Sequence, residues 1–135
     1  MSGPEQLQSD PKDIFPLARI ESSEQNGVRV LAVVGELDIS NIDLLQREAF
    51  ELSNGSLGLV LDLNETTHID SATIRLLFDL QRGLARRRQA LRVIYAAGSI
   101  VERVLELTAF DRQAPRSPDR DTATAAIRAE VSPSQ

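Results

Sequence analysis

The sequence predicts one α/β domain with a mixed, mostly parallel β-sheet flanked by helices. Its length of 135 residues suits a single domain. Strand-like and helix-like hydrophobic patterns alternate along it, which is typical of parallel strands joined by helical crossovers. A hairpin signal near the start adds an antiparallel pair. We expect the domain to span residues 14–130, between flexible tails at residues 1–13 and 131–135.

The first two strands are predicted to form a β-hairpin. Residues 15–20 are a short apolar stretch, and residues 28–34 are rich in β-branched side chains. Between these stretches lies Asn26-Gly27, a dipeptide that tolerates positive φ and favours a tight turn.

A helix and a buried strand are predicted next. Ser40 and Asp43 have capping-box spacing, so we expect the helix to open at Ser40. Apolar residues then recur at helical spacing: Ile42, Leu45, Ala49 and Leu52. Residues 57–63 are apolar almost throughout, as expected of a central strand covered on both faces.

The second half of the chain repeats this alternation after a polar loop. The next helical stripe comprises Ile74, Leu77, Phe78 and Leu84. Residues 91–95 predict another buried strand, and Ser99 with Glu102 predicts a third helix that ends near Thr108. Asp121 is the expected cap of a short fourth helix.

Composition and charge narrow the classes of function. The net charge of −5 and the pI near 4.9 argue against direct nucleic-acid binding. Cysteine is absent, so disulfides and thiolate metal sites are excluded. The chain shows no signal peptide and no apolar run long enough to span a membrane, so we expect a cytoplasmic protein.

Motifs for common catalytic chemistry are missing, and we expect neither an enzyme nor a bound cofactor or metal. There is no Gly-x-Ser-x-Gly elbow and no phosphate-binding Gly-x-x-x-x-Gly-Lys loop. The only lysine is Lys12, whereas a receiver domain needs one after its last strand. Small-molecule sensing stays open as a further alternative.

Several isolated polar residues have a structural interpretation beside a functional one. Asp38, Asp62 and Asp70 follow predicted strands, where turn and cap chemistry is favoured over a metal or acid/base site. Residues 86–88, three arginines, complement the negative end of a helix dipole. His68 is a candidate ligand or pH switch, although a lone histidine in a polar loop more often has neither role.

The segment around Ser71 carries the strongest functional signal. It lies where a short loop leads into a helix, so Asp70 or Ser71 can act simply as an N-cap. The local pattern alone favours the N-cap, but the free amides of a helix start also tolerate an anion, so a phosphate on Ser71 could be accommodated there. Such a phosphate adds about −1.5 to −2 charges and would disrupt a partner docked over the helix start.

Three motifs resemble those of STAS domains, in the same order. They are Gly35-Glu36-Leu37-Asp38; residues 59–63 followed by Ile69-Asp70-Ser71; and residues 101–111. The resemblance spans about residues 15–130 and implies a single STAS-type domain of the anti-sigma-factor-antagonist branch. In that branch the serine after the aspartate is phosphorylated by an anti-sigma factor that is itself a serine kinase, and a phosphatase resets it.

The resemblance implies a set of site residues. Ser71 is the expected phosphorylation site, and the expected partner contacts are Asp38, Asp70, Ala72, Thr73 and Arg75. The branch usually has glycine at the position of Thr73, and a β-branched residue there alters the fit of a kinase. Thr73 and Ser99 are secondary phosphorylation candidates. The alternative is a STAS adaptor subunit of a transporter or stress-signalling complex, without a phosphate cycle.

Overall fold

The computed structural model describes residues 10–14 and 17–131, the former by their backbone alone. Within these residues, six strands form one sheet in the order β1-β2-β3-β4-β6, with β5 pairing against β3. The two pairs formed by β1 with β2 and β2 with β3 are antiparallel, and all other pairs are parallel. The strands are β1 (Asp10–Ile14), β2 (Ala18–Gln25), β3 (Val28–Leu37), β4 (Gly58–Asp62), β5 (Thr66–Ile69) and β6 (Ala90–Ile94). The expected mixed, mostly parallel α/β fold is confirmed.

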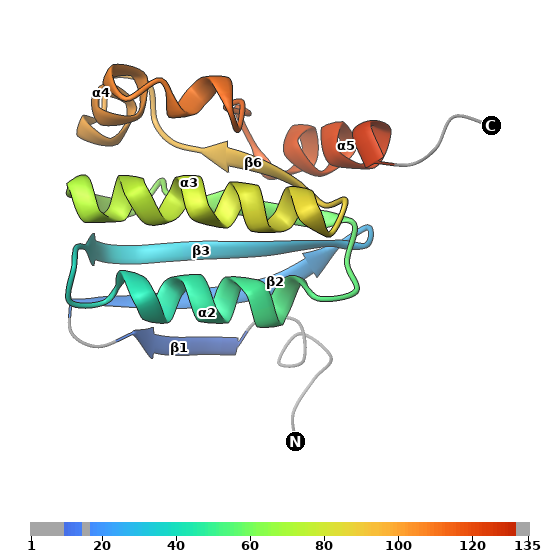
Figure 1. The fold of residues 1–135 in the computed structure, drawn as a ribbon, viewed down its shortest axis with the longest axis horizontal. Coiled ribbons are helices and arrows are strands. Elements are labelled where there is room, and N and C mark those ends of the chain that lie inside the picture. Colours follow the sequence, from blue (N-terminus) through green and yellow to red (C-terminus); the bar gives the residue numbers. More distant parts are fainter. Residues whose placement is uncertain (1–9, 15–16, 132–135) are drawn as a thin grey trace.

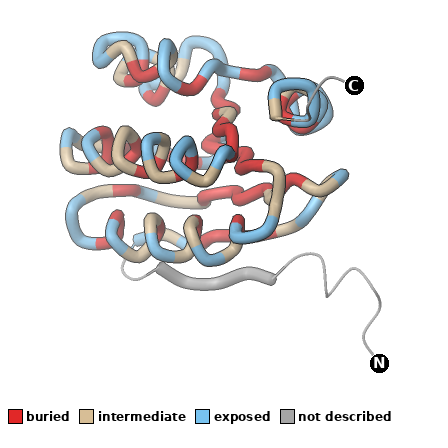
Figure 2. The backbone as a smooth tube through the Cα atoms, turned by 45° about the vertical axis from the view of Figure 1, so that its right-hand side comes forward, coloured by how far each residue is buried: buried red, intermediate tan, exposed pale blue. Residues whose placement is uncertain are grey.

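Helices cover both faces of this sheet, and Figure 1 shows their arrangement around the strands. They are α2 (Ile42–Ser53), α3 (Ser71–Arg86), α4 (Ile100–Leu107) and α5 (Arg120–Val131), and a short 3-10 helix, η1 (Phe110–Arg112), follows α4. The larger apolar core lies between the sheet and α2, α3 and α4. A smaller core joins the opposite face to α5 through residues such as Val30, Val60 and Ile127. Figure 2 shows buried backbone concentrated in the strands between these layers.

Strand β3 changes partner along its length, and Gly35 lies at the change. Residues 29–32 of β3 pair with β4, whereas Gly35 to Leu37 pair with β5, with a register shift after Gly35. Gly35 has a φ of 118°, and a Cβ there would lie 2.2 Å from the carbonyl oxygen of Leu17. Only glycine fits this backbone, which explains the first residue of the Gly35-Glu36-Leu37-Asp38 motif.

The N-terminal boundary differs from the sequence-based one. Residues 10–13, expected in a flexible tail, belong to β1, which pairs antiparallel with β2. The sequence hides this strand because Pro11 disfavours a sheet interior, but β1 is an edge strand, where proline is tolerated. Residues 1–9 and 132–135 lie outside the described residues.

The predicted hairpin is present, but its first strand, β2, runs over Ala18–Gln25 rather than over residues 15–20. Of the predicted range, residues 15 and 16 lie outside the described part of the chain. Asn26 and Gly27 both have positive φ and connect β2 to β3. A further strand was missed. The segment expected to be a polar loop contains β5, which is held against β3 in part by a 2.9 Å hydrogen bond from the Thr66 hydroxyl to the Val33 carbonyl.

Two of the expected helix caps are wrong. Helix α2 begins at Ile42 with Asn41 as its N-cap, because the Ser40 hydroxyl donates to Asp38 instead. At α5 it is Asp119, not Asp121, whose carboxylate accepts a backbone hydrogen bond, from Thr122 at 2.7 Å.

The predicted cap of α4 is confirmed. The Ser99 hydroxyl accepts from the backbone N–H of Glu102 at 3.1 Å. The Glu102 carboxylate in turn accepts from the backbone N–H of Gly98 at 2.6 Å.

Candidate functional site

The candidate site lies where β3 and β5 end side by side. Leu37 and Ile69 are register partners at the ends of these parallel strands. The chain after β3 turns into α2, and the chain after β5 turns into α3, so the two helix starts are neighbours (Figure 1). A hydrogen bond of 3.2 Å from the Ile39 backbone N–H to Asp70 Oδ2 joins the two loops directly.

Asp70 is the N-cap of α3. Its Oδ1 accepts from both the backbone N–H and the hydroxyl of Thr73, each at 2.8 Å. Partial burial tends to raise the pKa of Asp70, but the hydrogen bonds from Thr73 and Ile39, with the nearby His68, outweigh it and lower the pKa below the usual 3.8. Asp70 is therefore an ionised structural anchor.

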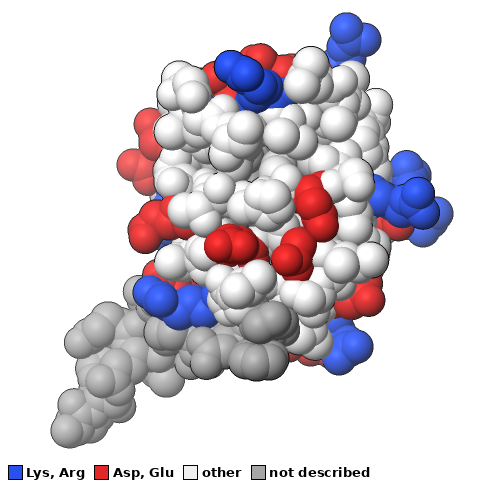
Figure 3. Space-filling view, turned by 90° about the vertical axis from the view of Figure 1, so that its left-hand side faces the viewer, with Lys and Arg blue, Asp and Glu red and all other residues white. Residues whose placement is uncertain are grey.

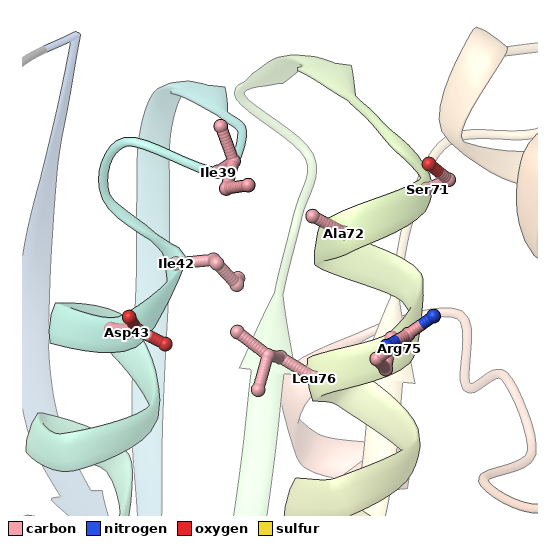
Figure 4. Close-up of a pocket in the computed structure, with 7 residues that line it drawn as sticks. All are labelled: Ile39, Ile42, Asp43, Ser71, Ala72, Arg75 and Leu76. Carbon is pink, nitrogen blue, oxygen red and sulfur yellow. The ribbon is translucent and has the colours of Figure 1, made fainter.

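Ser71 is the first residue of α3, and its side chain is exposed. No other described residue forms a hydrogen bond with its hydroxyl. The cap is made by Asp70, so Ser71 is not needed to start the helix. Figure 4 shows the Ser71 and Arg75 side chains on the outer side of α3, at the rim of the space between α2 and α3. The interpretation of Ser71 as the N-cap is wrong, and its hydroxyl is available for chemistry.

An open groove of about 470 Å³ lies between the first turns of α2 and α3. Its lining is mainly apolar: Ile39, Ile42, Asp43, Ser71, Ala72, Arg75 and Leu76. Figure 4 shows Ile39, Ile42, Ala72 and Leu76 converging on the space between the helices. Ile39 is 76% exposed, so it adds apolar surface that is accessible from solvent to this groove.

The molecular surface at this end combines apolar and acidic groups. Figure 3 looks onto it and shows a largely uncharged face with acidic side chains near its centre and basic ones toward its edges. Such a surface suits a protein partner, because apolar area drives association and charge restricts its choice.

Asp38 shapes the loop beside the groove. Its carboxylate accepts from the backbone N–H of Ser40 at 2.8 Å and from the Ser40 hydroxyl. The Asn41 side chain completes the turn by accepting from the Asp38 backbone N–H and donating to the Glu36 carbonyl. Asp38 is not among the residues that line the groove. Its side chain holds the loop that presents Ile39.

Only some of the expected site residues line the groove. Ser71, Ala72 and Arg75 line the groove, whereas Thr73 is 0% exposed. Thr73 therefore offers no side-chain surface to a partner or a kinase in this folded state. The expectation that it is a contact or a phosphorylation site does not fit its burial, which arises because residue 73 lies on the core-facing side of α3.

The Ser99 hydroxyl also has a structural role, since it donates to the Ala96 carbonyl at 2.7 Å in addition to capping α4.

The sequence did not predict Ile39, Ile42 and Leu76 as groove residues. The signal for Ile39 was a large apolar residue directly after the Gly-Glu-Leu-Asp motif, in a loop.

The remaining polar candidates lie elsewhere. Asp62 pairs with Arg120 at 3.0 Å and accepts from the Asn64 backbone N–H. Within residues 10–14 and 17–131, no group of three or more His, Asp or Glu side chains could hold a metal ion. Arg87 donates to the Phe50 carbonyl beyond the last turn of α3, and His68 is exposed on β5.

None of the helices in the described part of the chain is both long and apolar enough to span a membrane.

Solved structures with the same fold include anti-sigma factor antagonists. An anti-sigma factor antagonist from Mycobacterium paratuberculosis superposes with a TM-score of 0.71 at 22% identity, covering 95% of this chain and 99% of that one. The anti-sigma factor antagonist SpoIIAA in its unphosphorylated form gives a TM-score of 0.66 at 13% identity, with 82% and 96% covered.

A transporter contains the same fold as one part of a larger chain. The murine anion transporter Slc26a9 gives a TM-score of 0.68 at 12% identity, covering 90% of this chain but 22% of the transporter. At these identities the likeness concerns the fold. Among curated proteins, none matches the sequence significantly.

The family itself is established by the sequence. The model of the STAS domain matches residues 19–123, which is most of the chain and includes all three motifs and every residue of the groove. This chain belongs to the STAS domain family.

Proposed function

We propose that this chain is an anti-sigma-factor antagonist, a protein-binding switch that sequesters an anti-sigma factor with serine-kinase activity and so regulates transcription. The observation that supports this most is the exposed Ser71 hydroxyl at the edge of an apolar groove. A kinase can reach that hydroxyl, and a partner that docks in the groove covers it.

Phosphorylation of Ser71 would act on the partner's binding rather than on the fold. Asp70 keeps its hydrogen bonds to Thr73 whether or not Ser71 is modified, so α3 retains its cap. A phosphate on the first residue of a helix is also tolerated by the helix dipole. A partner docked over the groove would instead bury an unpaired double charge, at a cost of several kcal/mol. Each 1.4 kcal/mol corresponds to about a tenfold loss of affinity.

The test compares the partners and the phosphorylation of matched variants. Wild type, Ser71→Ala, Ser71→Asp and Ala125→Asp serve as baits in lysate of the source organism, with bound proteins identified by mass spectrometry. Ala125 is exposed on α5, so Ala125→Asp adds the same charge far from the groove. We expect an ATP-binding anti-sigma kinase on every bait except Ser71→Asp. Incubating that kinase with ATP should modify wild type but not Ser71→Ala, and a phosphatase should reverse the change.

The second candidate function is an adaptor subunit without a phosphate cycle. Thr73 supports it, because glycine is usual at this position in the antagonist branch, whereas here a buried threonine donates its hydroxyl to Asp70. An adaptor would bind one partner equally well with wild type and with Ser71→Asp. Recovery of the same transport or scaffold protein by both baits would replace the first proposal with this one.

A further inference from the structure

Arg75 stands out among the charged residues near Ser71. It lies four residues after Ser71 on α3, and its side chain is exposed. Within the described part of the chain, Arg75 has no hydrogen bond or ion pair through its side chain. By contrast, Arg82 on the same helix pairs with Asp79. Arg75 is thus a free cation beside the candidate phosphorylation site.

The helix directs Arg75 toward Ser71. Residues four apart lie on one face of a helix, with Cβ atoms about 5–6 Å apart. Long helical side chains also lean toward the N-terminus and cover the preceding turn. Figure 4 shows both side chains on the same side of α3, with the Arg75 guanidinium one turn below the Ser71 hydroxyl.

We propose that Arg75 is the internal counter-ion of a phosphate on Ser71. This deepens the function proposed above and rests on it. A guanidinium can donate two parallel hydrogen bonds to a phosphate, the geometry for which arginine is favoured. An acidic group placed four residues before a basic one is also the more stabilising order along a helix.

The pair gives the switch a second effect. In the unmodified protein Arg75 lines the groove and is free to contact a partner. In the phosphorylated protein the same guanidinium is held by the phosphate. Modification of Ser71 therefore adds negative charge to the contact surface and also withdraws its cation.

The acidic groups near Ser71 cannot take the place of Arg75, and one other arginine is an alternative that the experiment must test. The Asp70 carboxylate is occupied by Thr73 and Ile39, and Asp43 on α2 is acidic and would repel a phosphate. Arg103 on α4 is the alternative cation, since it is exposed and its side chain has no partner among the described residues. The experiment includes it for that reason.

The test installs phosphoserine directly at position 71 by genetic-code expansion, so it requires no kinase. Full-length protein is prepared with Ser71 or phosphoserine in four backgrounds: wild type, Arg75→Gln, Arg103→Gln and Arg86→Gln. Arg86 is an exposed arginine in the last turn of α3 and serves as the remote control. The melting temperature and the Arg75 Nε–Hε resonance are measured for each.

We expect phosphoserine to shift the Arg75 Nε–Hε resonance in wild type. For each background, the melting temperature of the phosphoserine protein is compared with that of the Ser71 protein. In Arg75→Gln the phosphoserine protein should lie about 1–2 °C lower, relative to its Ser71 counterpart, than it does in wild type, in line with the size of helical ion pairs. Arg103→Gln and Arg86→Gln should match wild type, and 1 M salt should diminish the difference. An unchanged Arg75 resonance, or an effect confined to Arg103→Gln, overturns the proposal.

The outcomes separate this inference from the proposed function. If modification abolishes partner binding but the Arg75 resonance and Arg75→Gln show no effect, the counter-ion proposal is wrong and the proposed switch stands. If the ion pair forms but the protein binds the same partner with and without phosphoserine, the proposed switch is wrong and the counter-ion proposal stands.

Discussion

Asp70 and Thr73 form a closed hydrogen-bonded turn at the start of α3. One carboxylate oxygen of Asp70 accepts from both the backbone N–H and the hydroxyl of Thr73, each at 2.8 Å. Its other oxygen accepts from the Ile39 backbone N–H across the groove. The helix cap and the contact between the two loops thus depend on a single side chain, next to the serine that we propose is modified.

The first prediction separates Asp70 from its neighbour Ser71. Asp70→Ala removes the N-cap and the bond to Ile39, so we expect it to lower the unfolding free energy by about 1–2 kcal/mol. Ser71→Ala removes an exposed hydroxyl without a partner, so its effect should stay within about 0.5 kcal/mol. Urea denaturation measures both. Equal losses for the two variants would mean that Ser71 contributes to the cap.

The second prediction concerns pH. The pKa of Asp70 is lower in the folded protein than the usual 3.8, so its ionised form stabilises the fold above about pH 4, and that stability is lost as the pH falls through the folded pKa. The difference in unfolding free energy between wild type and Asp70→Asn should be constant from about pH 5 to 7 and shrink below pH 4.

Comparison with Asp70→Asn is necessary because the pKa of Asp119 is also lowered in the folded protein. The backbone N–H of Thr122 lowers the pKa of Asp119, so the wild-type curve contains contributions from both carboxylates. A difference curve that stays flat down to pH 2 would contradict the role of Asp70.

Hydrophobic patterning predicted the elements whose burial is periodic or continuous. The apolar run at residues 57–63 became β4 and its flanks, because it is covered on both faces. Strand β5 was not predicted from the sequence, because its four residues, Thr66 to Ile69, are mostly polar and only the end residues are buried. Its pairing depends on β3 and on the bond from Thr66 to Val33, which are tertiary features.

The candidate site was likewise predictable only where it depends on local sequence. The position of Ser71 at a helix start follows from local sequence, and the motif points to it. The burial of Thr73 and the exposure of Ile39 depend on how α2 and α3 pack, which local sequence does not encode. The N-cap of α2 is Asn41 and not the predicted Ser40, because the Ser40 hydroxyl donates a hydrogen bond to the Asp38 carboxylate.

The third prediction concerns the change of partner along β3. Gly35→Ala would place a Cβ against the Leu17 carbonyl oxygen at a φ of 118°, so the backbone must move. Gly55→Ala has a comparable positive φ of 82° but open space around the Cβ. We expect Gly35→Ala to lower the unfolding free energy by at least about 2 kcal/mol more than Gly55→Ala. Similar losses in thermal or urea unfolding would mean that the strand ends can shift freely.

The last prediction tests the groove itself. Ile39 is 76% exposed and Leu107, near the end of α4, is 79% exposed, so serine at either position should leave the unfolding free energy nearly unchanged. A docked partner would bury Ile39 with Ile42, Ala72 and Leu76, and central apolar contacts carry much of the binding energy. We therefore expect Ile39→Ser to weaken binding of the partner by about tenfold or more and Leu107→Ser to change it little.

Isothermal titration calorimetry with the captured partner measures both affinities, and urea unfolding confirms that each variant is folded. A loss of affinity for Leu107→Ser with none for Ile39→Ser would move the interface to α4. That result would also separate Ser71 from the contact, because Ile39 and Ser71 line one groove and Leu107 does not. A phosphate on Ser71 could then act only at a distance, and the direct electrostatic mechanism proposed for the switch would fail.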